Sequence, residues 1–214
     1  MHRGKLVFIW LQMYFPKDIK KCGLFLSGGI DSALILYHLS KLPVEVYPIH
    51  GYDINASEMD TITVAQNVKN WILMDGIQKK DLKAKIHDIF IHPMDYGDKP
   101  KYYYMRPARK YLEQRFAVTH WVFGTSQGMP GDERPGNSMK GKELQNLPDN
   151  YNDIIVPWAY KNKQDIAKEY AEFNLNELAN ITNSCIKSTP VPCRECWWCK
   201  ERYWAFNSYD GGVQ

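Results

Sequence analysis

Apolar and polar positions follow two different periods along this chain. Short apolar runs bounded by Gly, Pro or polar residues predict buried strands, whereas apolar residues three or four positions apart predict helices. The predicted strands cover residues 23–26, 44–49, 85–91, 118–123 and 154–158. The predicted helices cover residues 31–39, 57–73, 108–117 and 163–173. Strands and helices therefore alternate, which is typical of an α/β fold in which helices cover both faces of a parallel sheet.

Composition narrows the class of protein. The 214 residues are enough for one domain with a real core, and we treat residues 1–214 as a single domain. The net charge of +3 is too small to indicate a nucleic-acid-binding surface by itself. No stretch approaches the length of about 20 apolar residues that a bilayer span needs, and the apolar residues 6–11 are interpreted as a first strand or a packed N-terminal arm. We expect a cytoplasmic protein without membrane or nucleic-acid partners, and a homodimer is compatible with the sequence.

The first predicted strand and helix are joined by the hexapeptide Ser27-Gly28-Gly29-Ile30-Asp31-Ser32. Its two glycines can adopt positive φ and let an anion approach bare backbone amides. Ser27 and Ser32 add hydroxyl donors, and the helix that starts near Asp31 adds unpaired N–H groups and the positive end of its dipole. The turn therefore has the makings of a phosphate-binding site. It is no Walker A loop, because no Lys and Ser/Thr follow Gly29, and it lacks the third glycine of a dinucleotide fingerprint.

Two other positions follow predicted strands in the same way as Ser27. His50 comes directly after the second strand, and Gly124 after the fourth. Ligands of open parallel sheets bind outside the carboxyl ends of the strands, so these three residues are expected to meet in space. Cys22, which opens the first strand, is interpreted as a buried small residue without a role.

Four of the five cysteines lie close together near the C-terminus, as Cys185, Cys193, Cys196 and Cys199. The last three form a C-x-x-C-x-x-C motif, a spacing that directs several thiolates at one ion. Four thiolates make a closed tetrahedral zinc site of structural role. Disulfides would need an oxidising compartment that nothing else in the sequence supports, and an iron–sulfur cluster stays open on spacing alone. We expect structural zinc, held within residues 182–206.

Two motifs resemble those of known enzymes. The hexapeptide resembles the PP-loop of the ATP pyrophosphatase superfamily, whose members bind ATP at this turn and usually activate a substrate as its adenylate. The C-terminal segment resembles the signature of the 7-cyano-7-deazaguanine synthase family, in which a T-x-S-C element precedes C-x-x-C-x-x-C and R-x-x-A-F follows it. The matching residues are Thr182, Ser184, Cys185, Cys193, Cys196, Cys199, Arg202, Ala205 and Phe206. Pro157, Lys163 and Ile166 match a further segment of that family, and the resemblance spans about residues 22–206.

The resemblance implies an adenine-nucleotide α-hydrolase-like fold and an ATP-dependent ligase. The family converts 7-carboxy-7-deazaguanine and ammonia to 7-cyano-7-deazaguanine (preQ0), a precursor of queuosine-type bases, and its implied cofactors here are ATP, Mg²⁺ and structural Zn²⁺. Lys163, and Arg106 before the central helix, would neutralise charge on the phosphates, while Asp31 would hold Mg²⁺. The expected catalytic residues are Asp31, Ser32, Lys163 and Arg106. The expected nucleotide contacts are Leu26, Ser27, Gly28, Gly29, Ile30, Asp31, Ser32, Ala33 and Gly124.

The acceptor side departs from the pattern of this family. Residues 50–53 read His-Gly-Tyr-Asp where the family usually has a Y-G-Q-type motif, and residues 131–135 lack the cysteine of its aspartate–cysteine–arginine element. The polar loop 128–153 is too long for a plain connector, so we expect it to order over the substrate. Arg134 is the residue of this loop best able to pair with a carboxylate, and Thr182 is assigned to the same substrate site.

Two alternatives stay open. A related enzyme would adenylate another acceptor, such as a modified deazaguanine or a group on tRNA or protein. A module of another class would bind nucleic acid through the aromatic pair Trp197 and Trp198 together with Lys200 and Arg202. The second alternative accounts for the cysteines but leaves the hexapeptide without a function.

Overall fold

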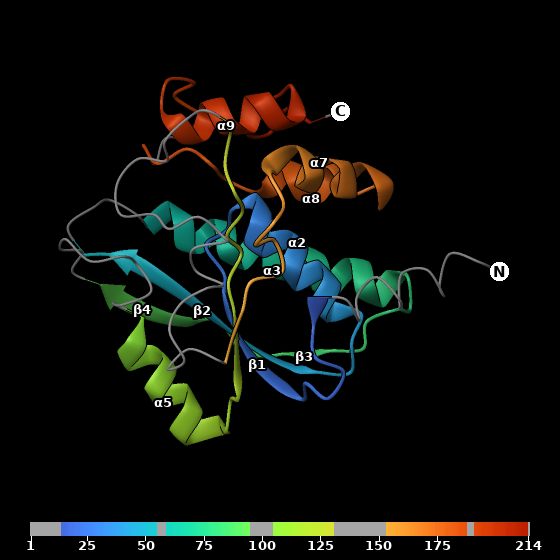
Figure 1. Cartoon of the computed structure of the whole chain (residues 1–214), viewed down its shortest axis with the longest axis vertical. Helices are drawn as coiled ribbons and strands as arrows, with labels where there is room; N and C mark the ends of the chain where they lie inside the picture. The colour runs from blue at the N-terminus through green and yellow to red at the C-terminus, as the bar shows by residue number, and fades with distance from the viewer. Residues whose placement is uncertain (1–13, 55–58, 95–104, 131–152, 188–190, 214) are drawn as a thin grey trace.

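The computed structural model describes residues 14–54, 59–94, 105–130, 153–187 and 191–213 (Figure 1). Within these residues, six strands form one sheet in which every pairing is parallel. They are β1 (Lys21–Phe25), β2 (Glu45–Asp53), β3 (Lys85–Ile86), β4 (Phe90–Met94), β5 (His120–Val122) and β6 (Ile154–Ile155). Their order is β3–β2–β1–β5–β6, and β4 also pairs with β2. The expected parallel sheet is confirmed, whereas residues 6–11 lie outside the described part of the chain.

The edge of the sheet beside β2 consists of two short strands instead of the single strand over residues 85–91 that the sequence predicts. β3 pairs with the start of β2, and β4 pairs with residues 49–53 at its end. Pro93 lies inside β4, where a proline is tolerated because an edge strand does not need every N–H for pairing. The prediction that β2 stops at His50 and Gly51 is also wrong, because β4 supplies partners that carry β2 on to Asp53.

The helices lie on both faces of the sheet, as expected. In Figure 1, α5 (Arg106–Phe116) lies on one face, and α2 (Ile30–Ser40) and α3 (Met59–Gln78) lie on the other. Further out on that second side are α7 (Lys163–Glu172), α8 (Asn176–Ile181) and α9 (Trp197–Phe206), with α9 packed against α7. The sequence patterns do not predict α8 or α9. Among the described residues, no helix combines the length and the apolar character that crossing a membrane requires.

The end of α3 shows why one helix boundary is wrong. The predicted helix ends at residue 73, before Asp75 and Gly76, which the sequence indicates as a terminator, yet α3 continues to Gln78. A side chain at position 76 would bring its Cβ to 2.9 Å from Cβ of Leu82, and the amides of Asp81 and Leu82 donate to the Gly76 carbonyl at 3.0 and 3.2 Å. Gly76 therefore allows the next turn of chain to fold back on the helix instead of stopping it.

Two apolar clusters hold the layers together, one on each face of the sheet. On the α2 side, Leu24 and Val46 from the strands pack with Leu34, Ile72 and Tyr170 from the helices. Every residue of α2 is buried, which places this helix at the centre of the fold and accounts for its nearly continuous apolar sequence. On the α5 side, the cluster includes Ile49, Leu112, Val118, Trp121 and Phe123. Full burial of each large apolar side chain contributes roughly 1.5–3 kcal/mol, so this packing fixes where the strand ends lie.

Candidate functional site

The turn between β1 and α2 is formed by residues 26–29. Gly28 has φ of +81°, a conformation that glycine adopts without strain. A Cβ at this position would also lie 2.9 Å from Cγ1 of Val64 in α3. Gly29 is the N-cap of α2 and provides no side-chain cap. The first amides of α2 are therefore left without a capping oxygen from the N-cap side chain, as an anion-binding helix start requires.

Two serine hydroxyls of this turn accept hydrogen bonds from its own backbone amides. The Ser27 N–H donates to Ser32 Oγ at 3.2 Å, and the Gly29 N–H donates to Ser27 Oγ at 3.2 Å. Ser32 Oγ in turn donates to the Gly29 carbonyl at 3.2 Å. These hydroxyl oxygens are neutral acceptors for the amides of the turn. A phosphate can enter by replacing neutral acceptors with charged ones, and hydrogen bonds to ionised groups are roughly twice as strong.

The ends of the neighbouring strands meet at this turn. A Cβ at Gly124, just past β5, would lie 2.8 Å from the backbone N of Ser32, so only glycine allows such a close approach. His50 lies within β2 instead of beyond it, and its Nδ1–H donates to the Leu26 carbonyl at 2.8 Å. Its Nε2 then accepts from the hydroxyl of Thr61 in α3, at 3.0 Å. The structure thus brings positions 27, 50 and 124 together, and gives His50 a structural role that holds β1, β2 and α3 in register.

A buried ion pair lies beside the turn. Lys163, the first residue of α7, donates from Nζ to Oδ2 of Asp31. Both side chains are 11% exposed. The other carboxylate oxygen of Asp31, Oδ1, is buried and has no hydrogen-bond partner among the described residues. Since an orphaned carboxylate oxygen in a buried site is costly, it marks the place where a ligand or cation is expected.

This orphaned oxygen fits the expected role of Asp31. Mg²⁺ prefers carboxylate and phosphate oxygens and usually keeps several waters, so one free carboxylate oxygen is what such an ion would require from the protein side. Lys163 begins α7 although a cation opposes the helix dipole there, and its contact with Asp31 accounts for this position. The α7 start is fixed by a capping box, in which Asn162 and Asp165 each accept the backbone N–H of the other at 3.0 and 3.1 Å.

Glu201 is a buried residue of this site that sequence reasoning missed. It comes from α9, is 1% exposed, and places Oε2 3.9 Å from Nζ of Lys163. No motif in the sequence singles it out. Its position two residues after Cys199 is the only signal in the sequence that links it to the cysteine cluster.

The structure connects the remaining expected site residues less closely to the turn. Ala33 and Leu26 are buried next to it. Arg106 is exposed at the first residue of α5, and its action on phosphates stays a prediction. Arg134 and most of the loop 128–153 lie outside the described residues. Thr182 is buried, and its hydroxyl donates to the Ala179 carbonyl at 2.6 Å and accepts from Arg202 at 2.8 Å.

The four clustered cysteines form a compact group at the start of α9. Their Sγ atoms all lie within 4.8 Å of one another, and Cys196 is the N-cap of α9. The amide of Cys193 donates to Cys185 Sγ, and the amide of Cys196 donates to Cys193 Sγ, both at 3.4 Å. The backbone N–H groups of Cys196 and Glu195 lower the pKa of Cys193 to about 6, whereas burial raises the pKa of Cys199. The amides thus favour a thiolate, the form in which cysteine binds metals.

The spacing of these sulfurs fits one ion. Four thiolates at the usual Zn–S distance of about 2.3 Å in a tetrahedron are about 3.8 Å apart, and Cys193 Sγ lies 3.9 Å from Cys199 Sγ. A four-iron cluster attaches each thiolate to a different iron, which spreads the sulfurs further apart. None of the five cysteines, all of which lie in the described part of the chain, forms a disulfide. Burial of Cys22 raises its pKa to about 12, which makes this thiol inert.

One of the four residues of the alternative nucleic-acid-binding site is buried. Arg202 is 1% exposed and is held inside the protein, so the expectation that it contacts phosphates on the surface is wrong. Trp197 and Trp198 pack edge to face with ring centres 4.8 Å apart and are half-buried. Lys200 alone of the four named residues is exposed.

Comparisons with known proteins give structural likeness only. The sequence matches no protein-family model and no curated protein. The U34-tRNA thiolase NcsA from Methanococcus maripaludis, solved with its 4Fe–4S cluster, is similar over 95% of this chain and 71% of its own, with a TM-score of 0.46 and 14% identity. The NH3-dependent NAD synthetase from Campylobacter jejuni is similar over 81% and 72%, with a TM-score of 0.44 and 13% identity. A 4-thiouridine synthetase solved with RNA and ATP is similar over 82% and 45%, with a TM-score of 0.48 and 15% identity. Likeness at this level transfers no activity, so the function must be argued from the residues of this chain.

Proposed function

We propose that this protein is an ATP-dependent carbon–nitrogen ligase that converts 7-carboxy-7-deazaguanine and ammonia to 7-cyano-7-deazaguanine through an adenylated intermediate. The observation that carries the ATP part is the turn at residues 27–32, which combines replaceable hydroxyl acceptors, a helix start and an orphaned oxygen of Asp31. The acceptor is supported by the C-terminal residues from Thr182 to Phe206, which resemble the signature of the 7-cyano-7-deazaguanine synthase family.

The chemistry requires two activations. A carboxylate oxygen of the acceptor attacks the α-phosphorus of ATP, and the bond to the bridging oxygen of pyrophosphate breaks. The nitrogen of ammonia then attacks the acyl carbon and loses a proton, and AMP leaves with the electron pair of the C–O bond, which gives the amide. A second ATP activates the amide oxygen in the same way. AMP leaves once more while the nitrogen loses its remaining two protons, which gives the nitrile.

The residues at the turn supply positioning and charge. Amides of residues 27–29 and the start of α2 bind the phosphates, which lie where the serine hydroxyls now accept. Lys163 is placed to transfer its contact from Asp31 to a phosphate oxygen as negative charge develops on pyrophosphate, the usual role of such a cation in phosphoryl chemistry. Asp31 would then be free to hold Mg²⁺, which supplies further charge neutralisation when bound.

The test is a product analysis of purified protein with ATP, ammonium and 7-carboxy-7-deazaguanine. We expect mass spectrometry to find the nitrile, with two AMP and two pyrophosphate released for each nitrile formed. Release of ADP and phosphate would contradict adenylation. Accumulation of the amide with one AMP would show that the second activation does not take place in this chain.

A second candidate is the same adenylation directed at another acceptor. It is favoured by the departures from the family's pattern at residues 50–53 and 131–135. His50 is committed to Leu26 and Thr61, so this side chain offers little to a deazaguanine. ATP turnover that starts only with a different carboxylate or amide, and not with 7-carboxy-7-deazaguanine, would favour this candidate. Arg134→Ala should raise the KM for whichever carboxylate is used, while the KM for ATP stays nearly unchanged.

A further inference from the structure

One short segment, residues 182–185, touches both the nucleotide turn and the cysteine cluster. At one end, the amide of Asn183 donates to the Gly28 carbonyl at 3.1 Å. At the other end, Cys185 contributes its sulfur to the cluster. Asn183 and Cys185 also contact each other, because the amide of Cys185 donates to Oδ1 of Asn183 at 3.0 Å. The peptide that follows Gly28, where φ is +81°, is therefore oriented by a residue two positions from a metal ligand.

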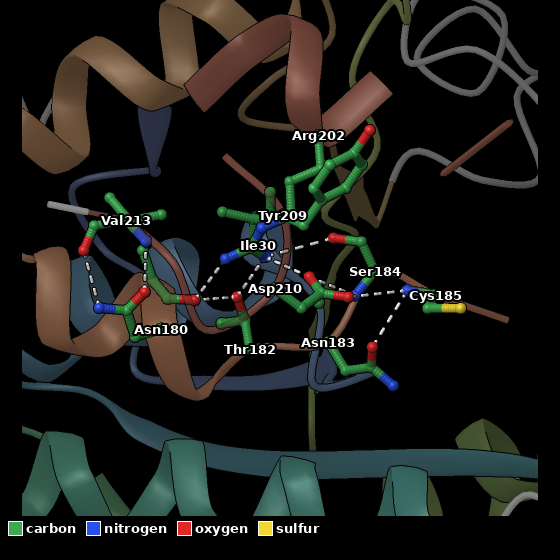
Figure 2. Close-up of polar contacts among 12 residues, drawn as sticks. Ile30, Asn180, Thr182, Asn183, Ser184, Cys185, Arg202, Tyr209, Asp210 and Val213 are labelled. Atoms are coloured by element: carbon green, nitrogen blue, oxygen red, sulfur yellow. Dashed lines mark hydrogen bonds and ion pairs between the residues drawn. The ribbon is translucent and has the colours of Figure 1, made fainter. Parts of the chain in front are cut away.

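The C-terminal tail holds this segment in place. The carboxylate of Asp210 accepts the amide of Ser184 at 3.0 Å and the amide of Cys185 at 3.1 Å (Figure 2). The tail itself is anchored by two hydrogen bonds between Asn180 and the backbone of Val213, at 2.9 and 2.7 Å. Charge-assisted bonds to two adjacent amides make Asp210 a clamp on the backbone next to the first cysteine.

Arg202 connects the clamp to α9. Its guanidinium is 1% exposed and pairs with Asp210 at 2.9 Å. It also donates to the Thr182 hydroxyl at 2.8 Å and to the Ala179 carbonyl at 2.7 Å. Because Arg202 follows Cys199 within the same helix, any rotation of α9 at the cluster moves a buried cation that grips the segment. Burial lowers the pKa of Arg202, but an arginine stays charged at neutral pH.

We propose that metal binding at the four cysteines and the conformation of the nucleotide turn are coupled through residues 182–185, with Asp210 and Arg202 as the positioning residues. The metal fixes Cys185 and the start of α9. The clamp transmits this fixed geometry to Asn183, whose amide holds the Gly28 carbonyl and thereby keeps the turn in its anion-binding form. The nucleotide part of this inference rests on the proposed function. Coupling between two sites is reciprocal, so nucleotide at the turn also retains the metal.

The experiment compares amide hydrogen exchange in metal-loaded and chelator-treated wild type, and in the loaded Asp210→Asn variant. We expect metal removal to speed exchange of the Ser27 and Gly29 amides about fivefold or more, the lower end of usual coupling strengths. Asp210→Asn should speed the same amides while metal is still bound. Amides of α5, on the opposite face of the sheet, serve as the internal reference for global unfolding.

The matched control is Glu195→Gln. Glu195 lies between two metal ligands in sequence, and its side chain is 79% exposed and pairs with Lys187 at 3.3 Å. The variant removes the same charge as Asp210→Asn without touching the segment, so its Ser27 and Gly29 amides should exchange as in wild type. Equal effects of the two variants would overturn the proposal, as would unchanged exchange at the turn when the metal is removed. If Asp210→Asn does not fold, the wild type with and without metal decides the matter alone.

A second measurement uses the nucleotide. Saturating ATP with Mg²⁺ should tighten the equilibrium affinity for the metal, measured by competition with a chromogenic chelator, by the same factor by which metal removal weakens ATP binding. If metal-loaded wild type binds no ATP, the proposed function is contradicted, and the exchange measurement still decides whether the two regions are coupled. ATP binding that is strong and independent of the metal would overturn the coupling and leave the proposed function intact.

Discussion

At the scale of single residues, the hydroxyl of Ser32 is the group most directly committed to the turn. It accepts from the Ser27 amide and donates to the Gly29 carbonyl. We expect Ser32→Ala to keep the fold and to lower kcat for ATP consumption about 10²–10³-fold, the usual loss when one preorganised hydrogen-bonding group is removed. Asp31→Asn should abolish turnover, because it removes the partner of Lys163 and the expected ligand of Mg²⁺. Initial rates of pyrophosphate release measure both effects.

Ser40→Ala is the matched control for this prediction. Ser40 ends the same helix, is buried, and donates only a local hydrogen bond to the Tyr37 carbonyl at 2.6 Å among the described contacts. Ser40→Ala removes the same hydroxyl group as Ser32→Ala and from the same helix, but at the end far from the turn. Wild-type turnover in Ser32→Ala, or an equal loss in Ser40→Ala, would mean that the turn is structural.

A second residue-scale prediction concerns pH. His38 is buried, and its Nε2 lies 3.1 Å from Oε2 of Glu169. Burial, helped by Lys161 and Lys41, lowers the pKa of His38 to about 3, so the neutral ring donates to the carboxylate. In the unfolded chain the pKa returns to about 6.5, so between these values the unfolded state binds the extra proton. This contribution to stability is therefore complete above pH 6.5 and is lost as the pH falls toward 3.

The slope of stability with pH tests this account. A single proton bound only by the unfolded state lowers the free energy of unfolding by up to about 1.4 kcal/mol for each pH unit. In His38→Gln the amide can still donate to Glu169 but does not titrate. We expect urea denaturation between pH 7 and 5.5 to give a shallower decline for the variant than for wild type. Parallel slopes would show that His38 does not titrate on unfolding.

At the scale of elements, the start of α7 positions Lys163. Asn162 caps this helix by accepting the amide of Asp165, and the carboxylate of Asp165 accepts the amide of Asn162. Asn162→Ala should cost about 1 kcal/mol of stability, the usual price of a lost cap. It should also raise the KM for ATP, because the first turn carries the ammonium that faces Asp31. Asn162→Asp keeps an acceptor and should restore both values in urea unfolding and in steady-state kinetics. An unchanged KM for ATP in Asn162→Ala would show that the cap does not position Lys163 for ATP binding.

The elements also show what the sequence can predict. Local signals sufficed where an element is defined by its own residues: the apolar run of β1, the hexapeptide after it, and the cysteine spacing. The fold class follows from their alternation. The split of the predicted third strand into β3 and β4, and the extension of β2 to Asp53, depend on pairing between strands distant in sequence. No local pattern contains that information.

The same distinction applies to the site. The ion pair of Lys163 with Asp31 joins residues 132 positions apart. Both residues could be named from a resemblance, but their pairing could not. Glu201 and Asp210 carry no motif. Glu201 matters because α9 packs against α7 and brings it near Lys163, and Asp210 matters because the tail folds back on residues 182–185. Arg202 was assignable to a signature, yet its burial could not be foreseen, since the sequence surrounds it with polar and aromatic residues.

At the scale of the whole molecule, a metal held by the four clustered cysteines is expected to stabilise the fold. A structural site of four thiolates contributes folding free energy directly, because it does not exist in the unfolded chain. Here the cluster includes Cys196, the N-cap of α9, and α9 packs against α7, which carries Lys163. We expect about one equivalent of zinc in purified protein, measured by plasma emission spectrometry. An iron–sulfur absorption band, or well-folded protein without metal, would contradict this assignment.

Removal of that metal should lower the stability of the whole domain. Each kcal/mol lost lowers the Tm of a domain of this size by about 2–4 °C, so loss of several kcal/mol should lower it by about 10 °C or more. Cys193→Ser should have the same effect and lose the metal, since it removes a ligand and the sulfur that accepts the Cys196 amide. Cys22→Ala is the control: Cys22 is buried in β1 outside the cluster, so this variant should lose some stability to a smaller side chain but keep its zinc. Calorimetry with metal analysis on the same samples distinguishes loss of the metal from loss of side-chain packing as the cause of a lower Tm. A Cys193→Ser protein that melts like wild type would show that the cluster does not stabilise the fold.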